Sequence, residues 1–143
     1  MLKPKVFLHN TSSYSPPINE QIVNQVVTRI SEEEKVIFGS INIIFMGTDE
    51  HTRLNIKNLG HTHETDILTF DLSDSTKVNT DIYINVDVAQ TNAQEYNEAI
   101  SHEFYRLCIH GLLHMAGYND HTDQEKLEMR KREDYYLKVS CET

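Results

Sequence analysis

The sequence predicts an α+β fold: a single domain, residues 1–143, in which a small mixed four-stranded sheet packs against about five helices. Three observations predict it. Runs of β-branched and aromatic residues alternate with segments whose apolar residues recur at helical spacing. The segments follow the order β-α-β-α-β-β-α-α-α, in which two consecutive strands are followed only by helices. A chain of 143 residues suits one domain that buries about two-thirds of its unfolded surface.

Two strand–helix units are predicted in the first half of the chain. Residues 5–9 form a short strand, and a polar loop rich in turn-forming residues follows it. Residues 40–46 are β-branched and aromatic, as in a strand, and Gly47 ends them. Thr48 then suits the N-cap of a short helix. Between these strands, residues 18–35 predict a helix with an apolar stripe made of Ile18, Ile22, Val26 and Ile30.

The second half of the chain predicts a strand pair and three helices. A loop at residues 58–65 precedes strands at residues 66–72 and 80–85. The connector between these strands is short, so we expect them to be antiparallel neighbours. The remaining segments predict helices at residues 87–97, 98–116 and 123–139. In the last of these helices the apolar residues expected to pack inward are Leu127, Met129, Tyr136 and Leu137.

The composition is that of a soluble globular protein and limits the classes of partner. Hydrophobic residues make up 38% of the chain and charged residues 24%. No apolar run approaches the roughly 20 residues that span a bilayer, and the N-terminus lacks the apolar stretch of a signal peptide. We therefore expect a cytoplasmic protein with no membrane partner. The net charge of −9 argues against broad, nonspecific nucleic-acid binding, and we expect no DNA partner, although a local basic patch is compatible with it.

Neither the cysteines nor the charged runs predict a site of their own. Cys108 is expected to pack as a small hydrophobe and Cys141 to lie in a frayed tail, with no disulfide between them in the cytoplasm. The acidic run 32–34 is expected to be a solvated helix end. In the last helix, spacings of three and four residues predict a solvated face of ion pairs. Its basic members are Lys126, Arg130, Lys131 and Arg132, and its acidic members are Glu125, Glu128 and Glu133.

Two histidines four residues apart predict a metal site. His110 and His114 share one face of the predicted helix and can direct two nitrogens at one cation. Gly117 can end that helix in a left-handed turn and bring the chain back with a third donor, Asp120 or His121. Imidazole is the commoner zinc ligand, and a carboxylate also serves. Three protein ligands with an open position are typical of catalytic zinc, so we expect one Zn²⁺ ion on a central helix.

The residues around these histidines resemble the signature of a known family. Residues 110–118, His-Gly-Leu-Leu-His-Met-Ala-Gly-Tyr, are similar to the H-G-x-L-H-x-x-G-Y-D-H signature of the YbeY family of bacterial endoribonucleases and rRNA maturation factors. Upstream, residues 65–70, Thr-Asp-Ile-Leu-Thr-Phe, resemble the family's T-D-V-L-S-F strand. Residues 54–55 and 81–82 resemble its preceding helix and its G-D-I strand. The resemblance covers about residues 40–135.

The resemblance implies that His110, His114 and Asp120 hold the zinc and its bound water. In the family the third ligand is a histidine ten residues after the first. An ungapped match puts Asp120 in that place, and we favour it. A one-residue insertion would restore His121 as the third ligand, so His121 stays the alternative.

One departure from the family pattern concerns RNA binding. The family usually carries an arginine six residues before the Thr-Asp pair, thought to bind or polarise the RNA phosphate, and this chain has Leu59 there. Either a nearby side chain replaces it, with His61 as the candidate catalytic residue of the loop, or the activity is weak. The other residues that could replace it are His63, Arg53 and Lys57.

The resemblance implies a cytoplasmic hydrolase, a zinc-dependent endonuclease that cuts single-stranded RNA. Its role would be rRNA processing, 16S rRNA 3′-end maturation, and ribosome biogenesis, with rRNA and the small ribosomal subunit as partners. An alternative is a non-catalytic ribosome-assembly factor whose zinc is structural. A metzincin-like metalloprotease is a third hypothesis. It is disfavoured because H-E-x-x-H enzymes carry a general-base glutamate where this chain has Gly111.

Overall fold

The computed structural model describes residues 3–59 and 65–141, and within these ranges it contains one four-stranded sheet and five α-helices. The predicted α+β fold class is confirmed. The strands are β1 (Lys5–Asn10), β2 (Phe38–Met46), β3 (Ile67–Asp71) and β4 (Val78–Asn85). The helices are α1 (Glu20–Glu34), α2 (Thr48–Leu59), α3 (Val86–Glu95), α4 (Ile100–Met115) and α5 (Asp123–Tyr136), followed by the π-helical turn η1 (Leu137–Cys141).

The sheet has the order β1-β2-β4-β3 and is mixed, as predicted. β1 and β4 both run parallel to β2, whereas β3 runs antiparallel to β4. The predicted antiparallel pairing of the last two strands in the chain, β3 and β4, is therefore confirmed, with Ile67 opposite Ile84 and Asp71 opposite Thr80. This order leaves β3 at one edge of the sheet.

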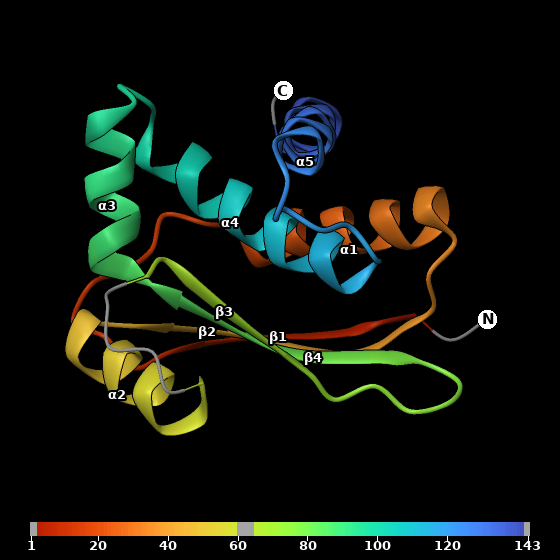
Figure 1. The fold of residues 1–143 in the computed structure, drawn as a ribbon, viewed down its shortest axis with the longest axis horizontal. Coiled ribbons are helices and arrows are strands. Elements are labelled where there is room, and N and C mark those ends of the chain that lie inside the picture. The colour runs from red at the N-terminus through yellow and green to blue at the C-terminus, as the bar shows by residue number, and fades with distance from the viewer. Residues whose placement is uncertain (1–2, 60–64, 142–143) are drawn as a thin grey trace.

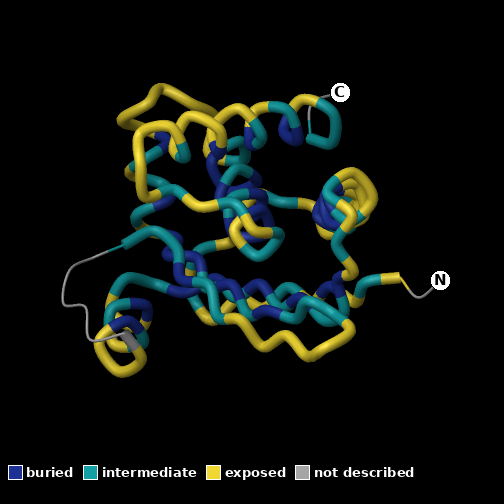
Figure 2. The backbone as a smooth tube through the Cα atoms, turned by 45° about the vertical axis from the view of Figure 1, so that its right-hand side comes forward, coloured by how far each residue is buried: buried dark blue, intermediate teal, exposed yellow. Residues whose placement is uncertain are grey.

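Helix α4 lies at the centre of the fold, as expected of the helix that carries the two histidines. Helices α1, α3, α4 and α5 lie on one side of the sheet and α2 lies on the other (Figure 1). Buried segments are concentrated between the sheet and the helices above it (Figure 2). The fully buried side chains of α4 include Phe104, Leu107, Ile109, Leu112 and Leu113.

The close approach of α4 to the sheet depends on Gly111. A Cβ atom at this position would lie 3.0 Å from Cδ1 of Ile82 and 3.2 Å from Cδ1 of Ile67. Contacts this short would be repulsive, so a larger residue would push the helix away from the sheet. Gly111 therefore sets the distance between the histidine-bearing helix and strands β3 and β4.

Two helix starts differ from the expectations, because the capping groups come from other residues. Helix α1 begins at Glu20, and the side chain of Asn19 caps it by accepting from the backbone N–H groups of Gln21 and Ile22. Thr48 was expected to cap α2 but lies inside it. Its N–H donates to the carboxylate of Asp87 at 2.9 Å, so a residue of α3 satisfies the start of α2.

The C-terminal segment departs from two expectations. Cys141 does not fray: it ends the turn η1 and packs against the core. Leu127 was expected to pack inward, yet it is 50% exposed. The inward face of α5 carries Met129 and Tyr136, and Leu127 stands two residues, or about 200°, away from Met129 on the helix.

Cys108 is buried, as predicted, and burial raises the pKa of its thiol to about 12. Both cysteines are free, in agreement with the expected absence of a disulfide. Among the described residues, no helix is both long and apolar enough to cross a bilayer.

The charged runs also differ from the expectations of solvated faces. Lys126, Arg130 and Lys131 are exposed, as predicted, but Arg132 is not free in solvent. Its Nη2 donates to Glu34 at 2.7 Å, and its guanidinium lies 4.7 Å from the ring centre of Tyr135. The last residue of the acidic run is thus tied to α5, because the end of α1 lies against that helix.

Candidate functional site

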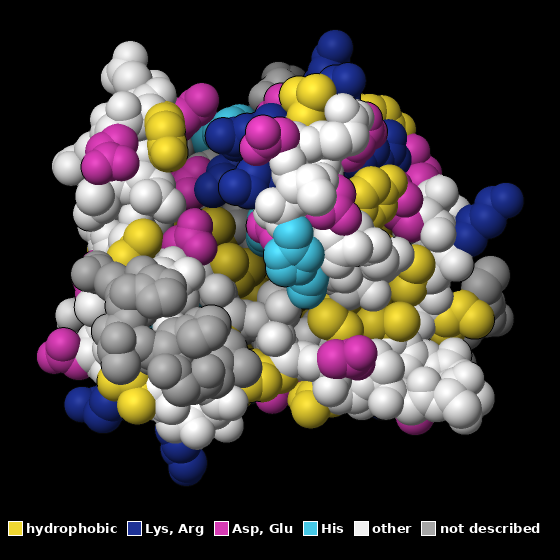
Figure 3. Space-filling view, viewed as in Figure 1, with side chains coloured by type: hydrophobic (Ala, Val, Ile, Leu, Met, Phe, Trp, Pro, Cys, Tyr) yellow, Lys and Arg dark blue, Asp and Glu magenta, His cyan; other side chains and the backbone are white. Residues whose placement is uncertain are grey.

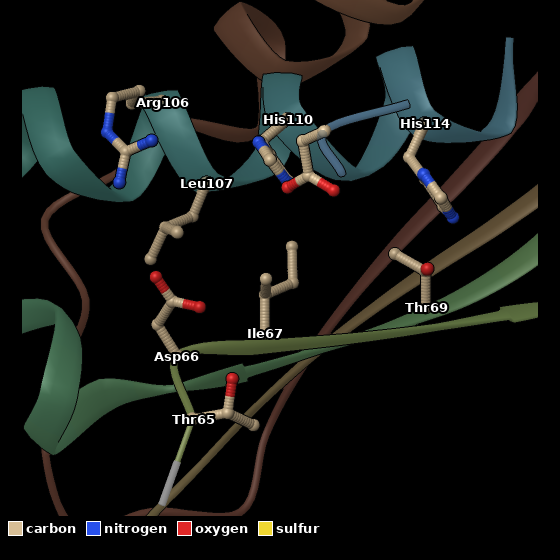
Figure 4. Close-up of a pocket in the computed structure, with 9 residues that line it drawn as sticks. Thr65, Asp66, Ile67, Thr69, Arg106, Leu107, His110 and His114 are labelled. Carbon is tan, nitrogen blue, oxygen red and sulfur yellow. The ribbon is translucent and has the colours of Figure 1, made fainter. Parts of the chain in front are cut away.

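A cavity of about 300 Å³ lies between α4 and the edge strand β3. The strand side is formed by residues of β3 and those just before it, and the helix side by α4 (Figure 4). The loop that joins α4 to α5 contributes Asp120. Histidine, acidic and basic side chains gather around a hollow on this face of the molecule (Figure 3). The lining residues are Thr65, Asp66, Ile67, Thr69, Arg106, Leu107, His110, His114 and Asp120.

The strand side of the cavity is fixed by Asn85 at the end of β4. Its side-chain amide donates to the carbonyl oxygen of Thr65 at 3.2 Å, and its backbone N–H donates to that of Asp66 at 2.9 Å. The Thr-Asp pair singled out in the sequence therefore has a defined backbone position. Its Asp66 carboxylate lies across the cavity from α4 (Figure 4).

His110 and His114 both line the cavity, as predicted from their spacing. Nδ1 of His110 lies 2.7 Å from Oε2 of Glu133, and Nδ1 of His114 lies 3.1 Å from the carbonyl oxygen of Tyr118. A carbonyl and an ionised carboxylate only accept hydrogen bonds, so in both neutral rings the proton belongs on Nδ1. Each Nε2 is then left with a free lone pair, the state that a metal-binding histidine requires.

Asp120 reaches the cavity, whereas His121 is exposed and does not line it. Oδ2 of Asp120 lies 3.4 Å from Nε2 of His110. The turn that brings Asp120 back is the predicted one: Gly117 has a φ of 110°, and the next residue, Tyr118, donates its N–H to the carbonyl oxygen of Leu113.

The donor set suits a metal ion, although it is not closed around one point. Among the described residues, no group of three His, Cys, Asp or Glu side chains converges tightly enough to hold an ion. The 3.4 Å between His110 and Asp120 matches the spacing of about 3.3–3.6 Å between two ligand atoms of a tetrahedral zinc site. His114 is exposed, so its ring has room to turn toward them.

A buried carboxylate, that of Glu133 on α5, contacts Nδ1 of His110. We expected Glu133 to form solvated ion pairs along α5, but it is only 2% exposed. The register that turns Met129 and Tyr136 inward also turns Glu133 inward, because it stands four residues after one and three before the other. This spacing was the one sequence signal that could have identified it.

Arg106 joins Glu133 to a second buried carboxylate, that of Glu103. Its Nε and Nη2 donate to the two oxygens of Glu103 at 2.8 and 2.7 Å, and its Nη1 donates to Glu133 at 3.1 Å. Asn92 extends the network by donating to Glu103 at 3.2 Å and to Asp66 at 3.5 Å. A chain of polar contacts thus runs from Asp66, just before β3, through α3 and α4 to α5.

The contact between His110 and Glu133 shifts the pKa values of both side chains. Burial alone would lower the pKa of His110, but the hydrogen bond and charge of Glu133 outweigh it and raise that pKa. Burial alone would raise the pKa of Glu133, but His110 and Arg106 hold it below its usual value. Glu133 therefore carries a full negative charge near neutral pH.

Of the residues expected to replace the family arginine, the structure describes Arg53 and Lys57. His61 and His63 lie outside the described residues, as does the side chain of Leu59. Arg53 and Lys57 are exposed on α2, on the opposite side of the sheet from α4, and neither lines the cavity (Figure 1).

Arg106 does line the cavity, although it belongs to none of the motifs found in the sequence. It stands four residues before His110, so the helical spacing that related the two histidines also relates it to them.

Comparison with known proteins agrees with the motifs. A profile of the family described as endoribonuclease YbeY matches residues 8–140. The endoribonuclease YbeY of Chlorobium phaeobacteroides is 34% identical over 119 residues, which cover 83% of this chain and 84% of that protein. The endoribonuclease YbeY of Chlorobaculum tepidum is 35% identical over 120 residues, covering 84% of this chain and 88% of that protein.

A solved structure shares the fold. The solution structure of a Thermotoga maritima protein superposes with a TM-score of 0.60 and 25% identity, over 93% of this chain and 87% of that one. The resemblance found in the motifs is confirmed, because the profile and the relatives match along most of the chain. The chain belongs to the endoribonuclease YbeY family.

Proposed function

We propose that this protein is a zinc-dependent endoribonuclease that cuts single-stranded RNA in rRNA processing. Family membership supports the reaction class. The observation that carries the metal is the pairing of both histidine Nδ1 atoms with acceptors, because it leaves two Nε2 lone pairs on the cavity side of α4. His110, His114 and Asp120 are the proposed ligands, and cleavage at the 3′ end of 16S rRNA during ribosome biogenesis is the proposed role.

The zinc would polarise a phosphoryl oxygen and increase the acidity of a coordinated water. The protein residues would orient the RNA. Arg106 lines the cavity, and its Nη1 and Nη2 each carry a second hydrogen beyond those donated to Glu133 and Glu103. We propose that this edge of the guanidinium faces the phosphate, in place of the arginine that the family carries where this chain has Leu59.

The geometry argues against the metalloprotease alternative. In H-E-x-x-H proteases the residue after the first histidine supplies a general base. Here that residue is Gly111, where an added Cβ would meet Ile82 and Ile67 of the sheet. The chain has neither the carboxylate nor the space for it at this position.

The proposal is tested with purified protein and a single-stranded RNA carrying the 3′ end of precursor 16S rRNA. Zinc-loaded protein should cut it internally and chelator-treated protein should not. His114→Ala should abolish cutting while the circular dichroism spectrum is unchanged, because His114 is exposed. His102→Ala is the matched control, since His102 lies on the same helix but outside the cavity.

Two results would contradict the proposal. Zinc-loaded wild-type protein that leaves this RNA intact would remove the enzyme assignment. Cutting of an unrelated RNA of equal length at the same rate would remove the rRNA role and leave the nuclease in place.

A further inference from the structure

The buried carboxylate of Glu133 occupies an unusual position for a residue on a highly charged helix. It is only 2% exposed, although α5 as a whole is rich in solvated charges. Burying a charge costs several kcal/mol unless it is well paired, so its position requires a reason. Its Oε2 lies 2.7 Å from Nδ1 of His110, on the side of the ring opposite the cavity.

Pairing with Arg106 does not by itself explain Glu133. The two donors on one edge of Arg106 already meet both oxygens of Glu103 at 2.8 and 2.7 Å. Glu133 adds a second carboxylate to a guanidinium whose charge Glu103 already balances, at a longer distance of 3.1 Å. The trio of two carboxylates and one guanidinium carries one net negative charge. The exposed guanidinium of Arg130 approaches Oε1 of Glu133 only to 3.7 Å, whereas the ring of His110 lies 2.7 Å from Oε2.

We infer that Glu133 is a positioning residue for His110, which fixes the ring so that Nε2 faces the cavity and makes that nitrogen a stronger ligand. This inference rests on the proposed metal site. A carboxylate that accepts from Nδ1 holds the proton there, sets the ring orientation and raises the basicity of Nε2. Arg106 acts indirectly, because it donates to the carboxylate of Glu133 and is itself held by Glu103.

The two histidines differ in this respect. Behind His114 stands the neutral carbonyl oxygen of Tyr118, whereas behind His110 stands a full negative charge. His110, the more buried of the two proposed ligands, is thus the one with the charged partner. Loss of Glu133 should weaken zinc binding by about 10–100-fold, the range typical of a partner behind a metal-bound histidine.

The experiment measures zinc affinity by competition with a chelator, at one pH, for wild type, Glu133→Gln and Glu133→Ala. Glu128→Gln is the matched control, because Glu128 is exposed on the same helix and contacts Gln124. The amide of Gln keeps an oxygen that accepts from Nδ1 but lacks the charge, so its loss of affinity should be smaller than that of Ala. The control should bind zinc as wild type does.

A second measurement reads the ring directly. In ¹⁵N spectra of the zinc-loaded wild type and of Glu133→Gln, His110 should show a proton on Nδ1 that exchanges slowly with water, and in Glu133→Ala this exchange should become fast. Glu133→Ala that is folded, binds zinc as tightly as wild type and keeps slow exchange would overturn the inference. If the Ala variant does not fold, unchanged affinity in Glu133→Gln together with fast exchange at Nδ1 would overturn it.

Failure of the proposed function gives a different result. Wild-type protein that binds zinc through His110 but leaves RNA intact would contradict the proposed nuclease activity. A higher zinc affinity of wild type than of Glu133→Ala would then still support the positioning role. Wild-type protein that binds no zinc contradicts both.

Discussion

The carbonyl oxygen of Tyr118 accepts from Nδ1 of His114 at 3.1 Å, while the hydroxyl of the same tyrosine donates to Glu34 at 2.9 Å. Glu34 also accepts from Tyr136 at 2.6 Å and from Arg132 at 2.7 Å. The loop that carries the proposed third ligand is therefore tied to the end of α1 and to α5 through one carboxylate.

The hydroxyl of Tyr118 should contribute to the stability of this loop. Tyr118→Phe removes one hydrogen bond to a charged acceptor and leaves the carbonyl behind His114 in place, so we expect a loss of about 1–2 kcal/mol in the free energy of unfolding. Urea denaturation of the zinc-free protein measures it. Tyr96→Phe is the control, because Tyr96 is 62% exposed and should cost almost nothing. Equal losses in the two variants would contradict a specific role for the Tyr118–Glu34 bond.

Glu34 should make stability depend on pH. Burial alone would raise its pKa, but hydrogen bonds from Tyr136, Arg132 and Tyr118 hold the pKa below its usual value. A lowered folded-state pKa means that the stabilisation is complete above the unfolded-state pKa of about 4.5 and is lost as the pH falls through the folded-state pKa.

The measurement compares the free energy of unfolding of wild type and Glu34→Gln between pH 7 and pH 3, without zinc. The difference between them should be constant above about pH 5.5 and shrink below pH 4.5. Glu32→Gln is the control, since Glu32 is exposed in the same acidic run. A difference that grows on acidification would have the wrong sign for this explanation.

The sequence could predict those features that depend on residues close to one another along the chain. The two histidines lie on one helix, and helical periodicity alone placed them on one face. The strand pair of β3 and β4 followed from a short connector. These are local relations, and the structure confirms them.

The missed residues depend on contacts between distant segments. Glu133 has Arg130 three residues before it, so its local pattern favours a solvated ion pair. The pair with Arg130 forms at 3.7 Å, but only the packing of α5 on α4 shows that Glu133 is buried and also contacts His110. Glu34 likewise stands at the end of an acidic run, and its partners Arg132 and Tyr136 are about 100 residues away. Charge pattern along one segment does not contain this information.

The third metal ligand is predicted to be Asp120. Asp120→Ala should reduce bound zinc from about one ion per chain to a small fraction of that value, because it removes the carboxylate that lies 3.4 Å from His110. His121→Ala should keep stoichiometric zinc, because His121 is exposed and does not line the cavity. Metal analysis after dialysis against metal-free buffer measures both. Zinc lost only in the His121 variant would replace Asp120 by His121 as the ligand.

Gly111→Ala tests the spacing between α4 and the sheet. Alanine favours a helix over glycine by about 1 kcal/mol, but overpacking a core costs typically about 1–3 kcal/mol. The overpacking should win, because the new Cβ would lie 3.0 Å from Cδ1 and 3.2 Å from Cγ2 of Ile82, which is fully buried and has no space to move into. We expect a net loss of up to about 2 kcal/mol in the free energy of unfolding, measured with denaturant.

The same substitution is also made in a protein that already carries Ile82→Val, which removes Cδ1 of Ile82 and leaves Cγ2. In that background Gly111→Ala should cost less than in wild type, because one of the three short contacts is gone. RNA cleavage by zinc-loaded Gly111→Ala should fall as well, since a shift of α4 moves His110 and Arg106 relative to Asp66, the residue before β3. Equal costs of Gly111→Ala in both backgrounds would show that the contact with Cδ1 of Ile82 does not set the position of the helix.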